Sequence, residues 1–371
     1  MKQHSTEMKT IVCTGGGTGG HIYPGLAVIE ELQRRYPFRV VWIGNEEGMD
    51  GKLIRDQGIE FYGIPSGKLR RYWSLQNIVD IGKVGRGFFA ARKILKELKP
   101  GLVFSKGGFV SVPPCAAAAS LGIPVFTHES DYTPGLATKI NLRFARRIFV
   151  AYEESRRFFP SAVQPRIVPV GNPVRRAFYE ADPEKGWRFL GLPSGERILL
   201  VLGGSQGARQ VNELVWASLP QLTSVYVVVH QTGPVQEGCP SPSERYRPMP
   251  YLRDELPHIL AASELVVGRS GAGTVWEAAT VGKPMVLIPL AGSGTRGDQV
   301  DNARFFERAG AARVLVGQAA QPDMLIQEVQ RLANERSLRT SMAEAAQRIG
   351  AIRAAQRIAE EILRFLEVGE G

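Results

Sequence analysis

The chain has 371 residues, of which 44% are hydrophobic and 22% charged. This ordinary composition excludes disordered, collagen-like and coiled-coil proteins and suggests two globular domains. Its net charge of +10 is unevenly placed, because residues 1–171 contain 24 basic and 14 acidic residues whereas the remainder contains 22 of each. Three widely spaced cysteines exclude a disulfide framework and a structural zinc site, and they fit a reducing compartment.

The basic first half indicates a contact with something anionic, such as nucleic acid, a membrane surface or a phosphorylated ligand. Solubility alone would not require the asymmetry. No segment is expected to act as a signal peptide or to span a membrane. The longest uncharged stretch, 107–127, contains Pro113, Pro114 and Pro124, so it predicts a loop, a short Ala-rich helix and a strand. We therefore expect a soluble protein.

Short apolar runs alternate with longer helical stretches along the whole chain. This alternation, with continuous apolar strands, predicts an α/β fold built on parallel, doubly wound sheets. The predicted strands are 9–13, 38–43, 102–104, 124–127 and 147–151 in the first half, and 198–202, 225–230, 265–268 and 284–288 in the second. Helices are predicted over 25–35, 78–98 and 275–281.

The same opening, an apolar strand that runs into a glycine-rich turn and a helix, occurs once in each half. It predicts two Rossmann-like domains facing across a cleft, 1–171 and 172–350. The tail 351–371 predicts an amphipathic helix that closes onto the first domain. Its apolar residues, spaced three or four apart, are Ile352, Ala355, Ile358, Ile362 and Phe365.

The first glycine-rich turn, 14–20, would bring backbone N–H groups and a positive helix end to one point, which suits a phosphate or an oxyanion. It also matches the GxGxxG fingerprint of dinucleotide-binding folds, with Glu46 placed as the ribose-binding acid. His21 lies at the helix start, where the positive helix end keeps an imidazole neutral, as a general base requires. The structural alternatives are a tight turn without a ligand and a histidine that only caps the helix.

The second glycine-rich turn, 202–208, repeats this design, and two such turns across a cleft would form a two-substrate site. A third stretch, 266–289, has the order strand, glycine-rich turn, short helix and strand that a nucleotide pocket needs. Within it, Glu277 would accept hydrogen bonds from two ribose hydroxyls. The structural alternative is a capping box formed by Thr274 and Glu277.

The segment 68–99 has nine basic residues and two acidic ones, with apolar residues between them. The basic residues are Lys68, Arg70, Arg71, Lys83, Arg86, Arg92, Lys93, Lys96 and Lys99, and the apolar ones are Tyr72, Trp73, Leu75, Ile78, Phe88 and Phe89. This mixture favours contact with anionic lipid, and its structural alternative is an ordinary helix with one solvated face. The chain has no Asp-x-Asp pair, P-loop, HExxH or GxSxG motif.

Five motifs are GGGTGGHIYPGLAV at 15–28, GNPVR at 171–175, GGSQGAR at 203–209, RSGAGTVWEAATVGKP at 269–284 and DQVDNA at 298–303. In this order and spacing they resemble the MurG family, the UDP-N-acetylglucosamine transferases that convert lipid I to lipid II in peptidoglycan synthesis. The resemblance runs from about Thr10 to the closing helix. It implies a two-domain glycosyltransferase of the B type (GT-B), inverting, metal-independent and without a cofactor, which agrees with the missing Asp-x-Asp pair.

The resemblance implies that the N-terminal domain takes the lipid-linked acceptor and that the C-terminal domain binds UDP-GlcNAc. It implies a peripheral protein on the cytoplasmic face of the bacterial cell membrane. By motif match, Thr18, Gly19, Gly20 and His21 lie near the diphosphate and the acceptor, with His21 as the candidate catalytic base. Arg175 and Ser205 would contact donor phosphate, the Leu252 backbone uracil, Thr274 phosphate, Glu277 ribose and Gln299 the GlcNAc hydroxyls.

Two positions depart from the family pattern. Asp131 stands where many members have Asn, so the donor contact of that Asn is not carried over, and Asp298 replaces a Gln of some members. Two interpretations from other functional classes remain. An NAD-type dehydrogenase would use the first turn and Glu46 but leave Glu277 without a role. A nucleic-acid binder would leave both glycine-rich turns unexplained, so no nucleic-acid partner is expected.

Overall fold

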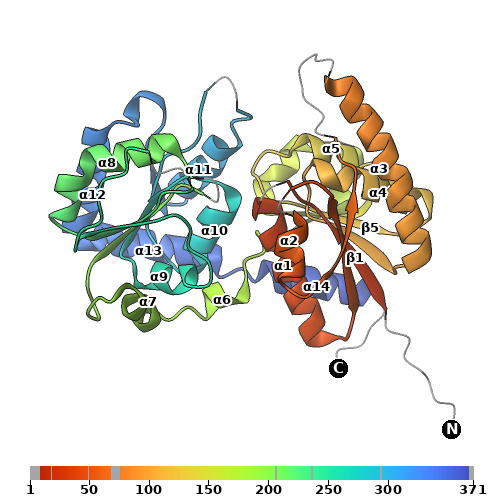
Figure 1. Ribbon diagram of the computed structural model, residues 1–371, viewed down its shortest axis with the longest axis horizontal. Helices are drawn as coiled ribbons and strands as arrows, with labels where there is room; N and C mark the ends of the chain where they lie inside the picture. Colours follow the sequence, from red (N-terminus) through yellow and green to blue (C-terminus); the bar gives the residue numbers. More distant parts are fainter. Residues whose placement is uncertain are drawn as a thin grey trace, which may run out of the picture. The chain divides into compact units, whose positions relative to one another are not determined.

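The computed structural model describes residues 9–17, 19–48, 50–67, 76–204, 207–234, 237–292 and 295–366, with the backbone alone for 76–81. These residues form two compact units. The first unit comprises the described residues up to Arg175 together with those from Arg353 onward, and the second runs from Arg176 to Ile352. Each unit is a parallel β-sheet with helices on both faces (Figure 1), which confirms the predicted α/β fold with two Rossmann-like domains.

The sheet of the first unit has the strand order β3-β2-β1-β4-β5-β6-β7. Its strands are β1 (Thr10–Thr14), β2 (Arg39–Asn45), β3 (Glu60–Ile64), β4 (Leu102–Ser105), β5 (Val125–Glu129), β6 (Ala145–Val150) and β7 (Ile167–Pro169). Its helices are α1 (Gly19–Arg35), α2 (Asp50–Arg55), α3 (Gln76–Leu98), α4 (Val112–Ser120), α5 (Leu136–Asn141) and α14 (Ala354–Phe365), with 3₁₀ turns η1 (Phe109–Ser111), η2 (Glu153–Phe158) and η3 (Ser161–Arg166).

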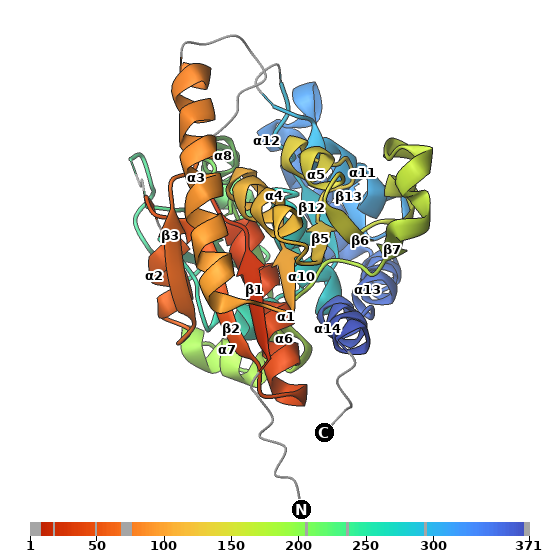
Figure 2. The same cartoon turned by 90° about the vertical axis from the view of Figure 1, so that its right-hand side faces the viewer.

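Two large apolar cores cover the two faces of this sheet, because successive residues of a strand point to opposite faces, and a smaller apolar cluster packs around β6 and β7. Ile11 of β1 lies in one core and Val12 in the other. The first core is closed by α1 and α14, which lie side by side (Figure 1, Figure 2), and α14 contributes Ile358 and Ile362 to it. The second core is closed by α3 and α4, with Leu95 of α3 fully buried.

The sheet of the second unit has the strand order β10-β9-β8-β11-β12-β13. Its strands are β8 (Ile198–Leu202), β9 (Val227–Gln231), β10 (Tyr246–Met249), β11 (Leu265–Gly268), β12 (Met285–Leu287) and β13 (Ala312–Val314). Its helices are α6 (Arg176–Tyr179), α7 (Pro183–Leu190), α8 (Arg209–Thr223), α9 (Leu256–Ala262), α10 (Ala272–Thr280), α11 (Asp298–Arg308), α12 (Pro322–Asn334) and α13 (Arg336–Gly350), with a 3₁₀ turn η4 (Gly317–Ala319).

The direction of winding decides where each unit can bind a ligand. All strands within a sheet are parallel, so their carboxyl ends share one edge. A ligand site forms on that edge where the strand order reverses. In the first sheet the reversal lies between β1 and β4, and in the second between β8 and β11. The residues that follow these four strands are therefore the candidate site residues.

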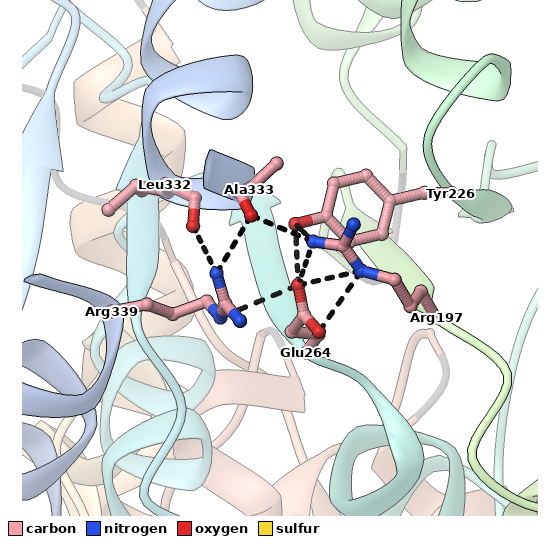
Figure 3. Close-up of polar contacts among 6 residues, drawn as sticks. All are labelled: Arg197, Tyr226, Glu264, Leu332, Ala333 and Arg339. Carbon is pink, nitrogen blue, oxygen red and sulfur yellow. Dashed lines mark hydrogen bonds and ion pairs between the residues drawn. The ribbon is translucent and has the colours of Figure 1, made fainter. Parts of the chain in front are cut away.

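The opposite edge of the second sheet carries a network of charged side chains (Figure 3). Glu264, directly before β11, accepts hydrogen bonds from Nη2 of Arg197 at 2.6 Å and from the hydroxyl of Tyr226 at 2.8 Å. Nε of Arg339 lies 3.4 Å from the same carboxylate. Both arginines also donate to backbone carbonyls in the last turn of α12. The network thus ties the starts of β8, β9 and β11 to the junction of α12 and α13.

The uncharged stretch 107–127 forms η1, α4 and the first part of β5, as predicted from its prolines. Among the helices described, none is long and apolar enough to cross a membrane.

Candidate active site

The glycine-rich turn after β1 is held in shape by two side chains of the first unit. Nε1 of Trp42 donates to the carbonyl of Gly15 at 3.1 Å. The carboxylate of Asp50 accepts the N–H of Gly17 at 3.1 and 3.2 Å to its two oxygens. Gly17 adopts φ +87°, a conformation that favours glycine. This N–H is therefore engaged by the protein, and a phosphate would be met by the helix that follows instead.

Asp50 is a site-shaping residue that sequence reasoning missed. It is 2% exposed at the start of α2, and burial raises the pKa of its carboxyl while the hydrogen bonds from Gly17 and Asn45 lower it. A Cβ atom on Gly16 would lie 2.0 Å from the Asp50 carboxylate. Close approach to Asp50 is thus one physical reason for glycine in this turn. No local pattern around residue 50 signals that role.

His21 lies in the first turn of α1 and packs against the glycine pair that follows β4. A Cβ atom on Gly108 would lie 3.1 Å from Cδ2 of His21, and one on Gly107 would lie 3.8 Å from Nδ1. Both glycines have positive φ, +77° and +81°. The imidazole therefore lies at the point where the strand order reverses, beside the positive end of α1. Gly19 and Gly20 begin the helix, where amides have no intrahelical partner, whereas Thr18 lies outside the described residues.

Glu129, at the end of β5, has both carboxylate oxygens engaged. One accepts the N–H of Asp131 at 3.0 Å. The other accepts the N–H of Gly135 at 3.0 Å and the hydroxyl of Thr138 at 2.6 Å. These bonds make Glu129 a structural acceptor that shapes the turn from β5 to α5, which leaves it poorly suited to serve as a base.

Arg175 is brought to the same helix as His21. Its guanidinium lies 4.9 Å from the ring centroid of Tyr23, a residue in the second turn of α1. A guanidinium stacked on an aromatic ring keeps its N–H groups at the ring edge, where they can meet an anion. The structure thus brings His21 and Arg175 onto one helix terminus of the first unit.

In the second unit, Gln231 joins two predicted site segments. Its Nε2 donates to the carbonyl of Gly204 at 3.1 Å, and its Oε1 accepts the N–H of Leu252 at 3.0 Å. Gln231 is the last residue of β9 and is 4% exposed. The Leu252 N–H is therefore engaged by the protein, so the Leu252 carbonyl is the backbone group that could meet a nucleobase. Sequence reasoning missed Gln231, and Ser205 lies outside the described residues.

The structural alternative for Thr274 and Glu277 is wrong. The Ncap residue of α10 is Gly271, with extended backbone angles, so both residues lie inside the helix and form no capping box. No side chain caps this helix end in the described part of the chain. A Cβ atom on Gly271 or Gly273 would meet no described atom within 4 Å. The N-terminus of α10 therefore presents first-turn N–H groups that have no partner within the helix, and such groups suit a phosphate.

Gln299 lies beside this helix end, at the start of α11. The hydroxyl of Ser270 donates to its carbonyl at 2.7 Å, and the N–H of Leu290 donates to its Oε1 at 2.9 Å. The remaining polar group of the Gln299 side chain is an NH₂ donor, suited to a sugar hydroxyl. Asp298 pairs with Arg296 at 3.0 Å. The structure thus brings Gln299 to the uncapped end that carries Thr274.

Two family models match the chain, the glycosyltransferase family 28 N-terminal domain over residues 11–150 and its C-terminal domain over residues 198–362. Among curated relatives, an enzyme of Treponema denticola is 48% identical over 351 residues, 89% of this chain and 90% of its own length. One of Shouchella clausii is 41% identical, over 93% of this chain and 97% of its own length. Both are named UDP-N-acetylglucosamine--N-acetylmuramyl-(pentapeptide) pyrophosphoryl-undecaprenol N-acetylglucosamine transferase.

Solved structures agree. The crystal structure of Acinetobacter baumannii MurG superposes with a TM-score of 0.72 at 29% identity, covering 96% of this chain and 99% of that chain. A co-structure of S. aureus MnaA with UDP has a TM-score of 0.71 at 13% identity, a likeness of fold alone. Nothing in these comparisons supports the dehydrogenase alternative built on Glu46. With both domain models matched and relatives above 40% identity over most of the chain, this protein belongs to glycosyltransferase family 28, in its MurG branch of N-acetylglucosamine transferases.

Proposed function

We propose that this enzyme transfers N-acetylglucosamine from UDP-GlcNAc to the muramyl 4-hydroxyl of undecaprenyl-diphospho-MurNAc-pentapeptide. The reaction converts lipid I to lipid II in peptidoglycan synthesis, with inversion at the sugar and without a metal ion. The observation that carries the proposal is the 48% identity, over nearly the full length of both chains, to a transferase named for this reaction.

The second unit takes the donor in this proposal. The open N-terminus of α10 receives the diphosphate, because unpaired backbone N–H groups and the helix dipole both favour an anion there. Glu277 accepts hydrogen bonds from the ribose hydroxyls, Gln299 donates to a GlcNAc hydroxyl, and the Leu252 carbonyl meets uracil. Ser205 would lie at the phosphates by its place in the motif.

The first unit takes the acceptor. His21 removes the proton of the muramyl 4-hydroxyl while the hydroxyl oxygen attacks the anomeric carbon of the donor sugar. The departing UDP leaves with an extra negative charge on its diphosphate, which needs preorganised donors. Arg175 and the amides of Gly19 and Gly20 supply positive charge and N–H groups for this phosphate and for that of the acceptor, and Thr18 would join them by its place in the motif.

The reaction itself is tested with purified enzyme, UDP-GlcNAc and a lipid I analogue. The expected product is the β-linked disaccharide, formed equally well in the presence of EDTA. NAD and oligonucleotide should not raise the melting temperature, whereas UDP-GlcNAc should. Absence of glycosyl transfer, with stabilisation by NAD instead, would overturn the proposal.

Replacement of Glu277 by Gln separates a ribose contact from a purely structural role. Because Gln keeps the size of the side chain and a hydrogen-bonding oxygen at this position inside α10, the variant should keep its melting temperature. Loss of the charged acceptor should weaken donor binding by about 1–3 kcal/mol, seen as a raised KM for UDP-GlcNAc. Glu335→Gln, which alters an exposed pair with Arg331, is the control and should leave this KM unchanged. A normal donor KM in Glu277→Gln would remove Glu277 from the site.

The membrane contact is also part of the proposal, and α3 supports it. Phe89 is 70% exposed, and Arg86, Lys93 and Lys96 are exposed on the same face of the helix, while Leu95 packs in the core. A basic face around an exposed aromatic ring suits an anionic leaflet. Of the other residues predicted for this contact, Phe88 packs against the core, Lys83 and Arg92 are half-buried and Lys99 is exposed. Outside the described residues lie Lys68, Arg70, Arg71, Tyr72, Trp73, Leu75 and the side chain of Ile78.

The contact predicts that a triple variant, Arg86→Gln, Lys93→Gln and Lys96→Gln, binds phosphatidylglycerol vesicles less tightly than wild type. At ~1 kcal/mol per charge the loss is about 3 kcal/mol, roughly 100-fold, and smaller at high salt. Activity on a vesicle-embedded acceptor should fall, and activity on a short-chain soluble acceptor should not. Neutralising exposed Lys185, Arg188 and Arg331 is the matched control. An equal loss on both acceptors would refute a membrane role for this face.

A further inference from the structure

A buried ammonium group lies at the carboxyl edge of the first sheet. Lys106, directly after β4, is 1% exposed. Its Nζ lies 2.8 Å from Nδ1 of His128 and 2.5 Å from Oγ of Ser130. No carboxylate of the described residues pairs with it within ion-pair distance, although the charges of Glu129 and Asp131 act on it. A buried cation without an ion pair destabilises the folded state, and such a cost indicates a functional role.

The ammonium fixes the direction of the hydrogen bonds around it, because it can only donate. Nδ1 of His128 must accept, so Nε2 carries the ring proton and donates to the carbonyl of Gly171 at 2.9 Å. Oγ of Ser130 accepts from Lys106 and passes its own hydrogen to Oδ1 of Asn172 at 2.8 Å. One lysine thus holds two successive residues of the chain.

These two residues lead directly to Arg175. Gly171 has φ +86°, so the chain turns there in a conformation that depends on being held. Arg175 follows three residues after Asn172 and stacks on Tyr23 of α1. The segment therefore determines where the guanidinium lies along the helix that also carries the candidate base.

The backbone of Lys106 meets the other half of the site. A Cβ atom on Gly15 would lie 3.1 Å from Cβ of Lys106, so the glycine-rich turn rests on this residue. Its N–H donates to the carbonyl of Thr14 at 2.8 Å. The next two residues are the glycine pair against which His21 packs. Lys106 is therefore connected to the candidate base through its backbone and to Arg175 through its side chain.

We propose that Lys106 is a positioning residue of the transfer reaction: its protonated side chain, acting through His128 and Ser130, places Arg175 against a substrate diphosphate. This inference rests on the proposed function. The diphosphate belongs either to the donor or to the acceptor, which share the same chemistry, and the two are distinguished by separate KM measurements.

The positioning role has a pH signature. Burial lowers the pKa of Lys106 from 10.5 to about 8, against the raising effect of Glu129 and Asp131. His128 lies beside it, and its pKa is held well below its usual value by burial and by the Lys106 charge, while His21 packs against the glycine pair that follows Lys106. Without its proton the amine gains a lone pair and can accept as well as donate, so the hydrogen-bond directions of the network are no longer fixed and kcat should fall as pH rises through about 8.

The free energy of unfolding should follow the opposite trend with pH. The unfolded chain binds this proton more tightly than the folded chain, so the Lys106 contribution to stability improves as pH rises from about 8 toward 10.5. Activity and stability should therefore move in opposite directions over this range. Only the positioning role links the alkaline loss of kcat to this one amine.

The test compares Lys106→Met with Lys283→Met. Lys283 is partly buried, with its pKa also lowered to about 8 by burial, but it donates to the backbone carbonyl of Ala261 at 2.7 Å and is not a candidate site residue. With UDP-GlcNAc and a soluble lipid I analogue, Lys106→Met should lose about 10- to 100-fold in kcat and the alkaline limb near pH 8. Lys283→Met should retain both. A rise in the donor KM alone would assign the diphosphate to UDP-GlcNAc, and a rise in the acceptor KM alone to lipid I.

Ser130→Ala removes both hydrogen bonds of the Ser130 hydroxyl, from Lys106 and to Asn172, and serves if Lys106→Met does not fold. It should lower kcat by about 3- to 10-fold and keep the alkaline limb, because the amine remains. Wild-type kcat and pH profile in a folded Lys106→Met, equal losses in both lysine variants, or unaltered kinetics in Ser130→Ala would each overturn the proposal. Failure of the wild-type enzyme to transfer GlcNAc would instead overturn the proposed function.

Discussion

His21→Ala is expected to lower kcat by about 10²- to 10⁴-fold while leaving the KM for UDP-GlcNAc nearly unchanged. The imidazole lies in the first turn of α1, where the helix end disfavours a second positive charge. The ring packs against Gly107 and Gly108, and a side chain at Gly108 would crowd it. A base that acts on the acceptor hydroxyl contributes to the transition state and not to donor binding, so the loss should fall on kcat.

The matched control is His258→Ala in the second unit. Nδ1 of His258 accepts the N–H of Asp182 at 3.0 Å, a structural bond, so this variant should keep wild-type kinetics at a temperature where it is folded. The loss of rate at acid pH that protonation of a catalytic imidazole produces should be present in wild type and absent in His21→Ala. A kcat within threefold of wild type would mean that His21 only packs.

Glu264→Ala is expected to lower the free energy of unfolding by about 2–4 kcal/mol and to leave the kinetic constants of the folded enzyme unchanged. The change leaves Arg197 and Arg339 facing each other without the carboxylate that joins them. It lies at the amino edge of the second sheet, away from the strand ends that carry the site. Urea unfolding followed by circular dichroism measures the loss.

The same network gives stability a dependence on pH. Burial alone would raise the pKa of Glu264, but hydrogen bonds from Arg197 and Tyr226, with the charges of both arginines, outweigh burial and lower it. The stabilisation is therefore fully present above the unfolded value of about 4.5 and is lost as pH falls through the lower folded value. Glu335→Gln, at an exposed pair, should change stability by less than about 0.5 kcal/mol. A similar loss in both variants would contradict a special role for Glu264.

The central strands of both sheets were predictable because they are buried on two faces. Ile198–Leu202 is buried at every position and reads as a continuous apolar run. The prediction missed edge strands such as Glu60–Ile64, where polar and half-exposed residues alternate without a clear period. An edge strand is stabilised by one neighbour only, and that neighbour is remote in sequence. Local pattern therefore carries little information about it.

The candidate site divides in the same way. Glycine-rich turns after apolar strands can be recognised from the local sequence, so the segments that carry His21 and Glu277 could be predicted as candidate site segments. Asp50 and Gln231 were not, because each acts on a segment brought to it by the fold: Asp50 on Gly17, 33 residues away, and Gln231 on Leu252, 21 residues away. The capping box failed for a related reason. The extended backbone at Gly271 starts α10 earlier than the Thr274 pattern suggests.

The return of α14 to the first unit sets an order for folding during synthesis. Ile358 and Ile362 belong to the core formed by β1, β2 and α1, although most of the chain, residues 46–353, emerges from the ribosome in between. Every strand and helix of the second unit precedes Ala354, so the second unit is complete in the nascent chain first. The first unit waits with an uncovered apolar face until α14 has been synthesised. A premature stop before α14 would thus release one finished domain tethered to one that still exposes its core, the kind of product that chaperones and proteases select.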